Sequence, residues 1–541
     1  MFFPDIKSSF YGDTTYYDVR GIMKIKKSYE YIIIGSGFGG AFAAYNLAKA
    51  GRDVLVVERG VWVARDDSCW DEVKLHLEDP MYRGCTPFYI NQKKGKVEET
   101  WPDDTVGGMS TFYGAAAFRM REDDFLGAPG GDFEVRNGET AWPVSYRDME
   151  PFYDEAERLQ MVAGMRGEDI TEPKRKSDFP QKAPVLTAPS KRIWDAAEKL
   201  GLHPAHIPLA INFKGTRDGN ACVMCHTCDH YLCKVEAKND LSVAVLPEAM
   251  RYGAAVLANC RVVRINVVKG KAVSVDIVDQ ENGEKREIKA KNIICAAGAL
   301  ATPHLLVTSG IEHECPRGDI IGRHLMRHIN GVVSGIMPVR ANPEEVFHKL
   351  VSIPDYYHGD PEKKKSPAGG WGIIQEIHTP GTGVMKANVP AGLKNVAAFA
   401  SQFLLNLLCI AEDVPQYSNR VYPDISRTDR FGMPALRVYH RYAARDYAAR
   451  KALYRAARRI LVKAGALPVY TFPIETFSHA IGTCRFGTSP DTSVLDPECR
   501  VWGVKNLYVT DASFMPSGGS VNPSLTIGAN ALRVSSLLAK K

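Results

Sequence analysis

A strand–helix–strand pattern opens the informative part of the chain. Between residues 29 and 60, a short run rich in isoleucine precedes a glycine-rich segment, and an alanine-rich helical stretch follows to about Ala50. A second apolar run, residues 54–57, ends at Glu58. Short apolar runs bounded by turn residues are typical of strands buried on both faces. Gly51 comes directly after the helical stretch, where glycine commonly ends a helix.

The glycines between the first predicted strand and the helix indicate a dinucleotide-binding turn. Gly35 would allow a tight turn, Gly37 would let a pyrophosphate approach the backbone, and Gly40 would let the helix pack closely on the strand. Glu58 is placed to accept hydrogen bonds from ribose hydroxyls, and Arg59 beside it is a second candidate cofactor contact. NAD and FAD both bind to such a unit. Its position near the N-terminus of a long chain favours FAD.

The composition narrows the class of protein. The chain has 541 residues, 45% hydrophobic and 24% charged, which is ordinary for a soluble globular protein of several domain-sized units. Its formal net charge is only +6, and its most basic run, residues 362–365, is short, so a nucleic-acid partner is not expected. No apolar stretch approaches the roughly 20 residues that a transmembrane helix needs. Twelve cysteines in a chain this long form no disulfide framework, which indicates a reducing compartment, and we expect a cytoplasmic protein without a signal peptide.

The strongest signal lies near the C-terminus, in residues 479–487 (HAIGTCRFG), 506–513 (NLYVTDAS) and 518–526 (GGSVNPSLT). Here the sequence resembles the glucose–methanol–choline (GMC) family of FAD oxidoreductases. Residues 142–153 and 298–310 are similar to further segments of that family. The resemblance extends from about residue 28 to the C-terminus, and it is nearest in character to the bacterial sugar and glycoside oxidases and dehydrogenases.

This resemblance implies an α/β fold with two domains. A Rossmann-like FAD-binding domain is expected beside an α+β substrate domain built on an antiparallel sheet. Independently of the resemblance, Leu453, Ile460 and Leu461 would lie on one side of an amphipathic helix, which predicts a helix over residues 446–464. The FAD-binding domain would be discontinuous, comprising residues 28–140, 215–330 and 470–541. The substrate domain would comprise residues 141–214 and 331–469, and residues 1–27 form an N-terminal extension without a motif.

The resemblance also implies the catalytic pair. His479 matches the family's catalytic histidine, and its imidazole can accept a hydroxyl proton because it titrates near neutrality. Asn522 matches a position that is Asn or His in the family. Because an amide is no base near neutral pH, Asn522 is expected to orient the substrate oxygen as a donor.

Further cofactor contacts are implied around these motifs. Asp511 matches the acid that the family places beside the ribityl–pyrophosphate part of FAD, although an acid after a strand is equally typical of a helix N-cap. Val263 is expected beside the adenine. The remaining expected contacts are Gly108, Ser110, Ala297, Ala512, Asn522, Pro523 and Ser524.

One signature departs from the family pattern. In residues 107–113, Met109 replaces a small residue and Tyr113 stands where Asn or His is usual. Because this segment contains no histidine, the FAD is expected to be held non-covalently.

Two further groups could bind metal. Cys222, Cys225, Cys228 and Cys233 are spaced much like the thiolate ligands of iron–sulfur clusters, and some bacterial sugar dehydrogenases of the family carry a cluster in a similar region with different spacing. Zinc, with His226 or His230, and a metal-free loop of reduced thiols are the alternatives. His324 and His328 are four residues apart, as ligands on one helix face would be, but we interpret them as a hydrogen-bonded structural pair.

These features predict an enzyme that oxidises a CH–OH group by hydride transfer to FAD. A sugar or glycoside substrate is expected, for example at a ring secondary alcohol, and a sterol or long-chain alcohol is the alternative. A redox-silent protein like the hydroxynitrile lyases, which share the fold, is a third reading. The electron acceptor would be oxygen or a redox partner protein, and the oligomeric state is open.

Overall fold

The computed structural model describes residues 25–78, 80–91, 96–127, 140–215, 220–359, 371–387 and 389–541. Nearly all of the predicted N-terminal extension and the basic run at 362–365 lie outside these ranges. Within them, no helix is both long enough and apolar enough to cross a membrane.

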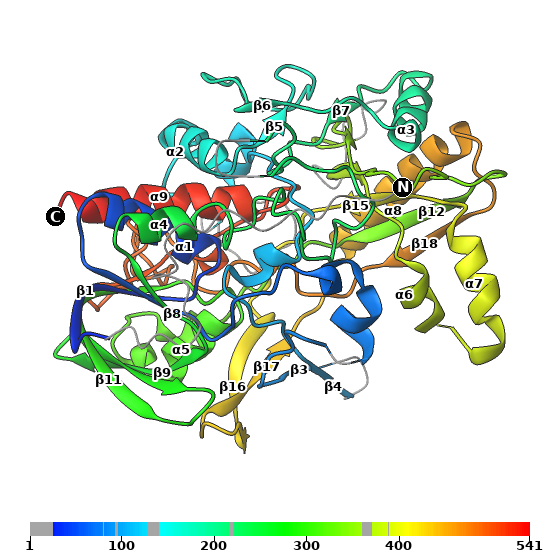
Figure 1. The fold of residues 1–541 in the computed structure, drawn as a ribbon. Coiled ribbons are helices and arrows are strands. Elements are labelled where there is room, and N and C mark those ends of the chain that lie inside the picture. Colours follow the sequence, from blue (N-terminus) through cyan, green and yellow to red (C-terminus); the bar gives the residue numbers. More distant parts are fainter. Residues whose placement is uncertain are drawn as a thin grey trace.

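A seven-stranded sheet forms one half of the molecule (Figure 1). Its order is β8-β2-β1-β11-β10-β9, with β19 also paired to β11, and the strands around β1 are parallel while β9, β10 and β11 are antiparallel. The strands are β1 (Ser28–Ile34), β2 (Val54–Val57), β8 (Ala255–Leu257), β9 (Cys260–Val268), β10 (Lys271–Asp279), β11 (Lys285–Cys295) and β19 (Leu507–Val509).

Helices cover this sheet in layers. Helix α1 (Phe38–Lys49) packs against α4 (Leu246–Arg251) and against the C-terminal helix α9 (Ser524–Ala539), which also contacts α2 (Tyr146–Leu159). Figure 1 shows α9, in red, lying along α1 and α4. Helix α1 and the C-terminal helix α9 therefore meet beside the predicted dinucleotide turn.

A six-stranded antiparallel sheet forms the other half, and this confirms the expected fold class. Its order is β18-β12-β15-β14-β13-β7, and the long helix α8 (Ala444–Lys463) packs on it and contacts α3 (Ala188–Glu198). The strands are β7 (Ala205–His206), β12 (Gly331–Ile336), β13 (Val351–Ile353), β14 (Ile373–Glu376), β15 (Leu404–Ile410) and β18 (Val469–Pro473). Helices α6 (Thr382–Ala387) and α7 (Lys394–Ser401) lie at its side in Figure 1.

A smaller mixed sheet joins the two halves. Its order is β16-β17-β3-β4, and β17 (Pro434–Tyr439) pairs in parallel with β3 (Phe88–Asn91). Strand β4 (Val97–Thr100) completes one edge and β16 (Arg420–Thr428) the other. The sheet thus combines strands from the predicted FAD-binding segments with strands from the predicted substrate segments. Helix α5 (Ala301–Thr308) contacts both β16 and β9 of the seven-stranded sheet.

The turn between β1 and α1 shows why glycine is needed there. Gly35 has φ +99°, a backbone conformation that residues with a side chain rarely adopt. A Cβ on Gly40 would lie 1.9 Å from the Gly35 carbonyl oxygen, so only glycine fits at this crossing of helix and turn. At the other end of α1, Gly51 has φ +77° and donates its N–H to the Ala48 carbonyl at 2.8 Å, as a helix-ending glycine does.

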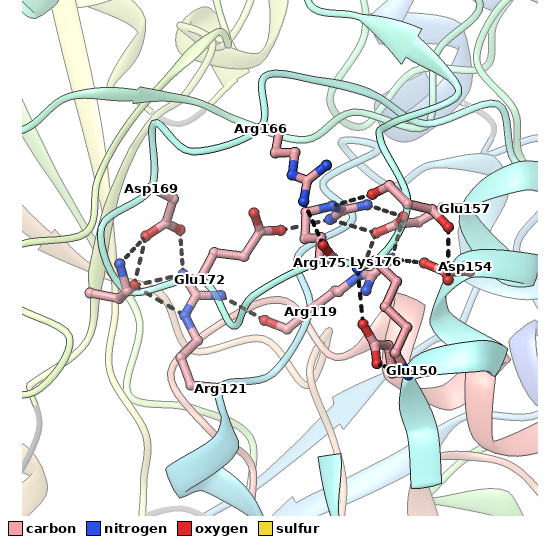
Figure 2. A network of polar contacts seen from close by, with 12 residues as sticks. Arg119, Arg121, Glu150, Asp154, Glu157, Arg166, Asp169, Glu172, Arg175 and Lys176 are labelled. Atoms are coloured by element: carbon pink, nitrogen blue, oxygen red, sulfur yellow. Dashed lines mark hydrogen bonds and ion pairs between the residues drawn. The ribbon is translucent and has the colours of Figure 1, made fainter. Parts of the chain in front are cut away.

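A buried network of charged side chains fastens residues 166–176 to helix α2 (Figure 2). Arg119, 1% exposed, donates to both carboxylate oxygens of Glu157 at 2.8 and 2.7 Å, and Arg175 binds the same carboxylate. Arg121 pairs with Asp169. Such charges are stable when buried only because each one is paired and hydrogen-bonded.

A short chain of hydrogen bonds continues from this region to the loop before Asn522. The backbone N–H of Arg121 donates to Asp124 Oδ2 at 2.6 Å, and the Tyr357 hydroxyl donates to the same oxygen at 2.6 Å. The Ser520 N–H in turn donates to the Tyr357 hydroxyl oxygen at 3.1 Å. The loop that carries Asn522 is therefore tied to the rigid layer around α2.

Candidate active site

A cavity of about 950 Å³ runs between the two large sheets. This volume is at the upper end of the roughly 300–1,000 Å³ typical of small-molecule sites. The cavity reaches the N-terminus of α1, whose N-cap Gly37 offers no side-chain cap and whose first turn has no acidic residue. The free N–H groups of the helix therefore face the cavity, as a pyrophosphate site requires. A Cβ added at Gly37 would meet no atom within 4 Å, so the space above this turn is open.

Glu58, at the end of β2, closes the dinucleotide turn. Its Oε2 accepts the backbone N–H and the hydroxyl of Ser36 at 2.8 and 2.6 Å, and its Oε1 accepts the Gly60 N–H at 2.7 Å. Burial raises the pKa of Glu58, and these hydrogen bonds act against that rise. The carboxylate also lines the cavity, at the place where the sequence predicts a ribose.

Asp511 combines the two roles that the sequence left open. It is the N-cap of the short helix at Ala512–Phe514, where its Oδ1 accepts the Ser513 N–H at 2.9 Å. Its Oδ2 accepts the Gly298 N–H at 3.0 Å and the Thr302 hydroxyl at 2.5 Å. The residue also lines the cavity. Asp511 therefore holds the end of β19 to the segment after β11 at the cofactor side of the cavity.

His479 lines the cavity and has a second histidine behind it. Its Nδ1 lies 2.9 Å from Nδ1 of His328 and 3.5 Å from the amide nitrogen of Asn330. Burial lowers the pKa of His479 to about 3, and the neighbouring His328 and Lys349 act in the same direction. The ring is therefore neutral near pH 7, which a general base requires. Nδ1 is occupied, so Nε2 is the nitrogen left for the cavity.

Asn522 lies in the same cavity, and its amide is oriented by β14. Gln375 donates its Nε2 hydrogen to Asn522 Oδ1 at 2.9 Å. Because the carbonyl side of the amide is taken, the NH₂ group remains as the donor, which is the role that the sequence predicts for this residue.

A buried ion pair also lines the cavity. Lys349 Nζ, at the end of the segment before β13, lies 2.7 Å from both oxygens of Asp229, and the two residues are 4% and 9% exposed. Burial alone would raise the pKa of Asp229, but Lys349 and His378 lower it well below its ordinary value. Gly114 makes room for this pair, since a Cβ there would lie 1.8 Å from Nζ.

The other predicted contacts can now be placed. Those that line the cavity are Gly35, Gly37, Arg59, Gly108, Ser110, Ala297, Ala512, Pro523 and Ser524. Gly40 lies beneath the turn rather than in the cavity. Val263 is not among the residues that line the cavity, whereas its neighbour Val262 is, and the contact of Val263 with the adenine stays a prediction.

Tyr113 lines the cavity, and its hydroxyl is held by hydrogen bonds within the protein. The hydroxyl donates to the Asn239 carbonyl at 3.0 Å and accepts from Gln160 Nε2 at 3.3 Å. Ser110 has a similar local function, since its hydroxyl donates to the Gly107 carbonyl at 2.7 Å and accepts the Leu241 N–H at 3.0 Å. Both side chains fasten this signature loop to residues 239–241.

The cysteine-rich loop gives no support for a metal cluster. Cys222, Cys225, Cys228 and Cys233 surround a void of about 20 Å³, yet the described part of the chain contains no group of three or more potential ligands arranged to hold a metal ion. Burial raises the pKa of the Cys222 thiol to about 12, which keeps it protonated. The loop is organised instead by the buried amine of Lys238, which donates to the carbonyls of Tyr113, Cys228 and Tyr231 at 3.1, 3.1 and 2.7 Å.

The sequence did not predict the contact of His328 with His479, or the placement of Lys349 and Asp229 at the cavity. The spacing of His324 and His328 suggests a pair, but the pair is wrong: both residues have positive φ, +62° and +57°, in a non-helical segment, and His328 contacts His479 instead. Neither an isolated lysine nor an aspartate in a cysteine-rich loop carries a local signal. These residues become functional candidates only through contacts between distant segments.

The fold and the cavity define a class of protein. A Rossmann-type dinucleotide turn opens into a cavity that also holds a neutral histidine and an oriented amide, and this arrangement is that of a dinucleotide-dependent oxidoreductase.

Comparisons with known proteins identify the family. Models of the GMC oxidoreductase family match residues 29–330 and 415–531, so the chain belongs to that family. It is 31% identical to 6'''-hydroxyparomomycin C oxidase of Streptomyces lividus, over 94% of this chain and 91% of that protein. It is also 31% identical to C-glycoside 3-oxidase of Microbacterium trichothecenolyticum, over 50% of this chain and 51% of that protein. Its fold resembles that of pyridoxine 4-oxidase from Mesorbium loti, with a TM-score of 0.64 and 18% identity over 95% and 100% of the two chains. The protein is therefore a GMC oxidoreductase that acts on CH–OH donors, and membership of the family implies FAD as cofactor.

Proposed function

We propose that the protein oxidises a secondary ring alcohol of a sugar or glycoside to a ketone. The observation that carries this proposal is the grouping of His479, Asn522 and the Lys349–Asp229 pair in one cavity. The first two residues suit oxidation of any alcohol. The charged pair suits a substrate with several hydroxyls, because a carboxylate accepts and an ammonium group donates hydrogen bonds to neighbouring hydroxyls.

Each residue has a defined task in this reaction. Asn522 donates its amide hydrogen to the substrate oxygen, and His479 Nε2 accepts the hydroxyl proton as the C–H bond breaks. FAD, when bound, supplies the acceptor for the hydride. Residues of the β1–α1 turn, with Glu58 and Asp511, would hold it non-covalently. Oxygen or a redox partner protein would be the final electron acceptor.

A sterol or long-chain alcohol fits the cavity less well. An apolar substrate would offer the buried charged pair no hydrogen-bond partner. Covering charged groups in this way costs free energy. A similarity to a relative named for a C-glycoside supports the same choice of substrate class.

The test is anaerobic reduction of the bound flavin, followed by its visible absorption. A glycoside with a free secondary hydroxyl should bleach the flavin, whereas its deoxy analogue at that carbon, a sterol and a long-chain alcohol should not. His479→Ala should abolish the bleaching, while His313→Ala, at an exposed histidine remote from the cavity, should not change it. Bleaching by the sterol or the long-chain alcohol alone would refute the sugar assignment. A flavin that no alcohol reduces would refute the redox reaction.

A further inference from the structure

His328 is the only side chain among the described residues that forms a hydrogen bond shorter than 3 Å with His479. The two Nδ1 atoms lie 2.9 Å apart, and the rings meet edge to face, with an interplanar angle of 89° and centroids 5.1 Å apart. Burial lowers the pKa of both rings. Both are therefore neutral near pH 7, and each carries a single N–H. A short contact between two Nδ1 atoms then requires that one is a donor and the other a bare acceptor.

The direction of this hydrogen bond decides whether His479 can act as a base. If His328 Nδ1 donated, His479 would carry its hydrogen on Nε2 and would face the cavity with a donor. If His479 Nδ1 donates, its Nε2 is bare and can accept a proton. The second arrangement requires His328 to carry its hydrogen on Nε2.

The surroundings of His328 Nε2 favour that arrangement. The nitrogen is buried without a hydrogen-bond partner among the described residues, and it lies against Gly518, where an added Cβ would come within 2.9 Å of it. The backbone of Gly518 and Gly519 acts to raise the pKa of His328, against the lowering by burial. The base role of His479 requires the same arrangement: a neutral ring with a bare Nε2 carries its hydrogen on Nδ1, and His328 Nδ1, at 2.9 Å, is closer to it than Asn330 and is the acceptor for that hydrogen.

Asp413 and Glu412 hold the backbone of His328 and the two glycines beside its ring in place. Asp413 Oδ1 accepts the His328 backbone N–H at 2.8 Å, and the Tyr442 hydroxyl donates to the His328 carbonyl at 2.9 Å. Glu412 Oε1 accepts the N–H groups of Gly518 and Gly519, each at 3.0 Å. The backbone of His328 and the glycines beside its ring are thus fixed by adjacent residues of one segment.

We propose that His328 is a positioning residue that holds His479 in the tautomer with a bare Nε2. This inference rests on the proposed function, because it needs His479 to be the base. In the reaction the substrate O–H and C–H bonds break and a C=O bond forms; the proton goes to His479 Nε2, and FAD, when bound, would supply the acceptor for the hydride. His479 then carries two N–H groups and one positive charge, and its Nδ1–H still donates to His328 Nδ1. That hydrogen bond becomes charge-assisted and stabilises the imidazolium. His328 remains neutral throughout.

The first test is nitrogen NMR of the FAD-loaded protein labelled with ¹⁵N-histidine. The His479 signals are assigned by their loss in His479→Gln. Chemical shifts that place the hydrogen of His479 on Nδ1 support the proposal, and a hydrogen on Nε2 overturns it. This measurement needs no turnover.

The second test uses variants of the positioning residue. His328→Leu removes the acceptor and should slow flavin reduction by roughly 10- to 100-fold, as loss of an outer partner of an active-site histidine commonly does. It should leave KM within about twofold and should abolish the single tautomer. His328→Gln, which restores an acceptor and a donor, should recover part of the rate. His324→Leu is the matched control, because His324 is also buried, has a similar φ and lies in the same segment without contacting His479.

The outcomes separate the two proposals. If His479→Ala stops flavin reduction but His328→Leu does not slow it, the positioning role is refuted and the proposed function stands. If neither variant affects reduction, the proposed function itself fails. If His328→Leu lowers the rate no more than His324→Leu does, the effect is structural and the inference is refuted.

Discussion

Removing one partner of the Lys349–Asp229 pair should destabilise the protein far more than removing both. In Lys349→Met, the carboxylate of Asp229 stays buried while the cation that held both of its oxygens at 2.7 Å is gone. Breaking a buried pair in this way costs about 3–5 kcal/mol, whereas replacing both charges by neutral groups of similar size is often close to neutral. We therefore expect the double variant Lys349→Met/Asp229→Asn to recover most of the lost stability.

The pKa of Asp229 determines how the loss of stability in Lys349→Met changes with pH. The pKa of Asp229 is depressed in the wild-type protein, so its contribution is fully present above the unfolded value near 4 and is lost only at lower pH. In Lys349→Met, burial without the lysine raises the pKa of Asp229 above the unfolded value. Below that raised pKa, and down to about pH 4, the unfolding free energy of the variant then rises by about 1.4 kcal/mol for each pH unit. The deficit of Lys349→Met should shrink from pH 8 to pH 5.

Urea unfolding of the wild-type protein, the single variants and the double variant at pH 8 and pH 5 measures both effects. Lys191→Met is the control, because Lys191 pairs with Asp195 at the surface and its loss should cost at most about 1 kcal/mol. Equal losses in Lys349→Met and in the double variant, with no change between the two pH values, would refute the description of a buried charged pair. If the pair binds hydroxyls, the folded double variant should also show a KM for the glycoside raised by roughly 10-fold or more, from the loss of hydrogen bonds to charged groups.

Two further predictions concern the cofactor turn and Glu412, the acid that binds Gly518 and Gly519. Gly40→Ala should prevent correct folding of the turn, because its Cβ would lie 1.9 Å from the Gly35 carbonyl oxygen. Gly37→Ala should fold normally but weaken FAD binding, and equal thermal stability of the two apoproteins would contradict this prediction. Burial raises the pKa of Glu412 to about 7, so its favourable contribution is present at low pH and is lost as pH rises through 7. Glu412→Gln keeps an acceptor for the glycine N–H groups without a charge, and it should gain roughly 1–3 kcal/mol over the wild type at pH 8.5 but little at pH 5. A gain of the same size at both pH values would show that ionisation of Glu412 is not the cause.

The parts of the fold that the sequence predicts well are those with local causes. The turn at Gly35, the end of α1 at Gly51 and the buried strand β2 follow from backbone conformation and from runs of apolar residues. The long helix α8, at Ala444–Lys463, agrees with its apolar periodicity within two residues. In each case the information lies within one or two turns of chain, so the neighbouring residues are sufficient.

The spacing of residues along the chain gave wrong predictions where tertiary contacts determine the backbone conformation. A four-residue interval between His324 and His328 suits a helix, but Met326 between them pairs with Ile481 as an isolated β-bridge, and the segment is not helical. The compact cysteine run suits a metal cluster, but its loop folds around the ammonium group of Lys238. The pairing of β3 with β17 had no signal, because register between distant strands depends on the complete fold.

The dependence on distant contacts is also the reason why the candidate site could be predicted only in part. Motifs identify single groups such as His479 and Asn522, because their neighbours in sequence form a recognisable turn. What those groups can do depends on partners far along the chain: His328 lies 151 residues from His479, Gln375 lies 147 from Asn522, and Asp229 lies 120 from Lys349. A base needs a fixed tautomer, a donor needs an occupied carbonyl, and a buried cation needs an anion. In the proposed site each requirement is met by a contact between distant segments, so the sequence motifs predict the candidate groups while their proposed chemistry depends on the fold.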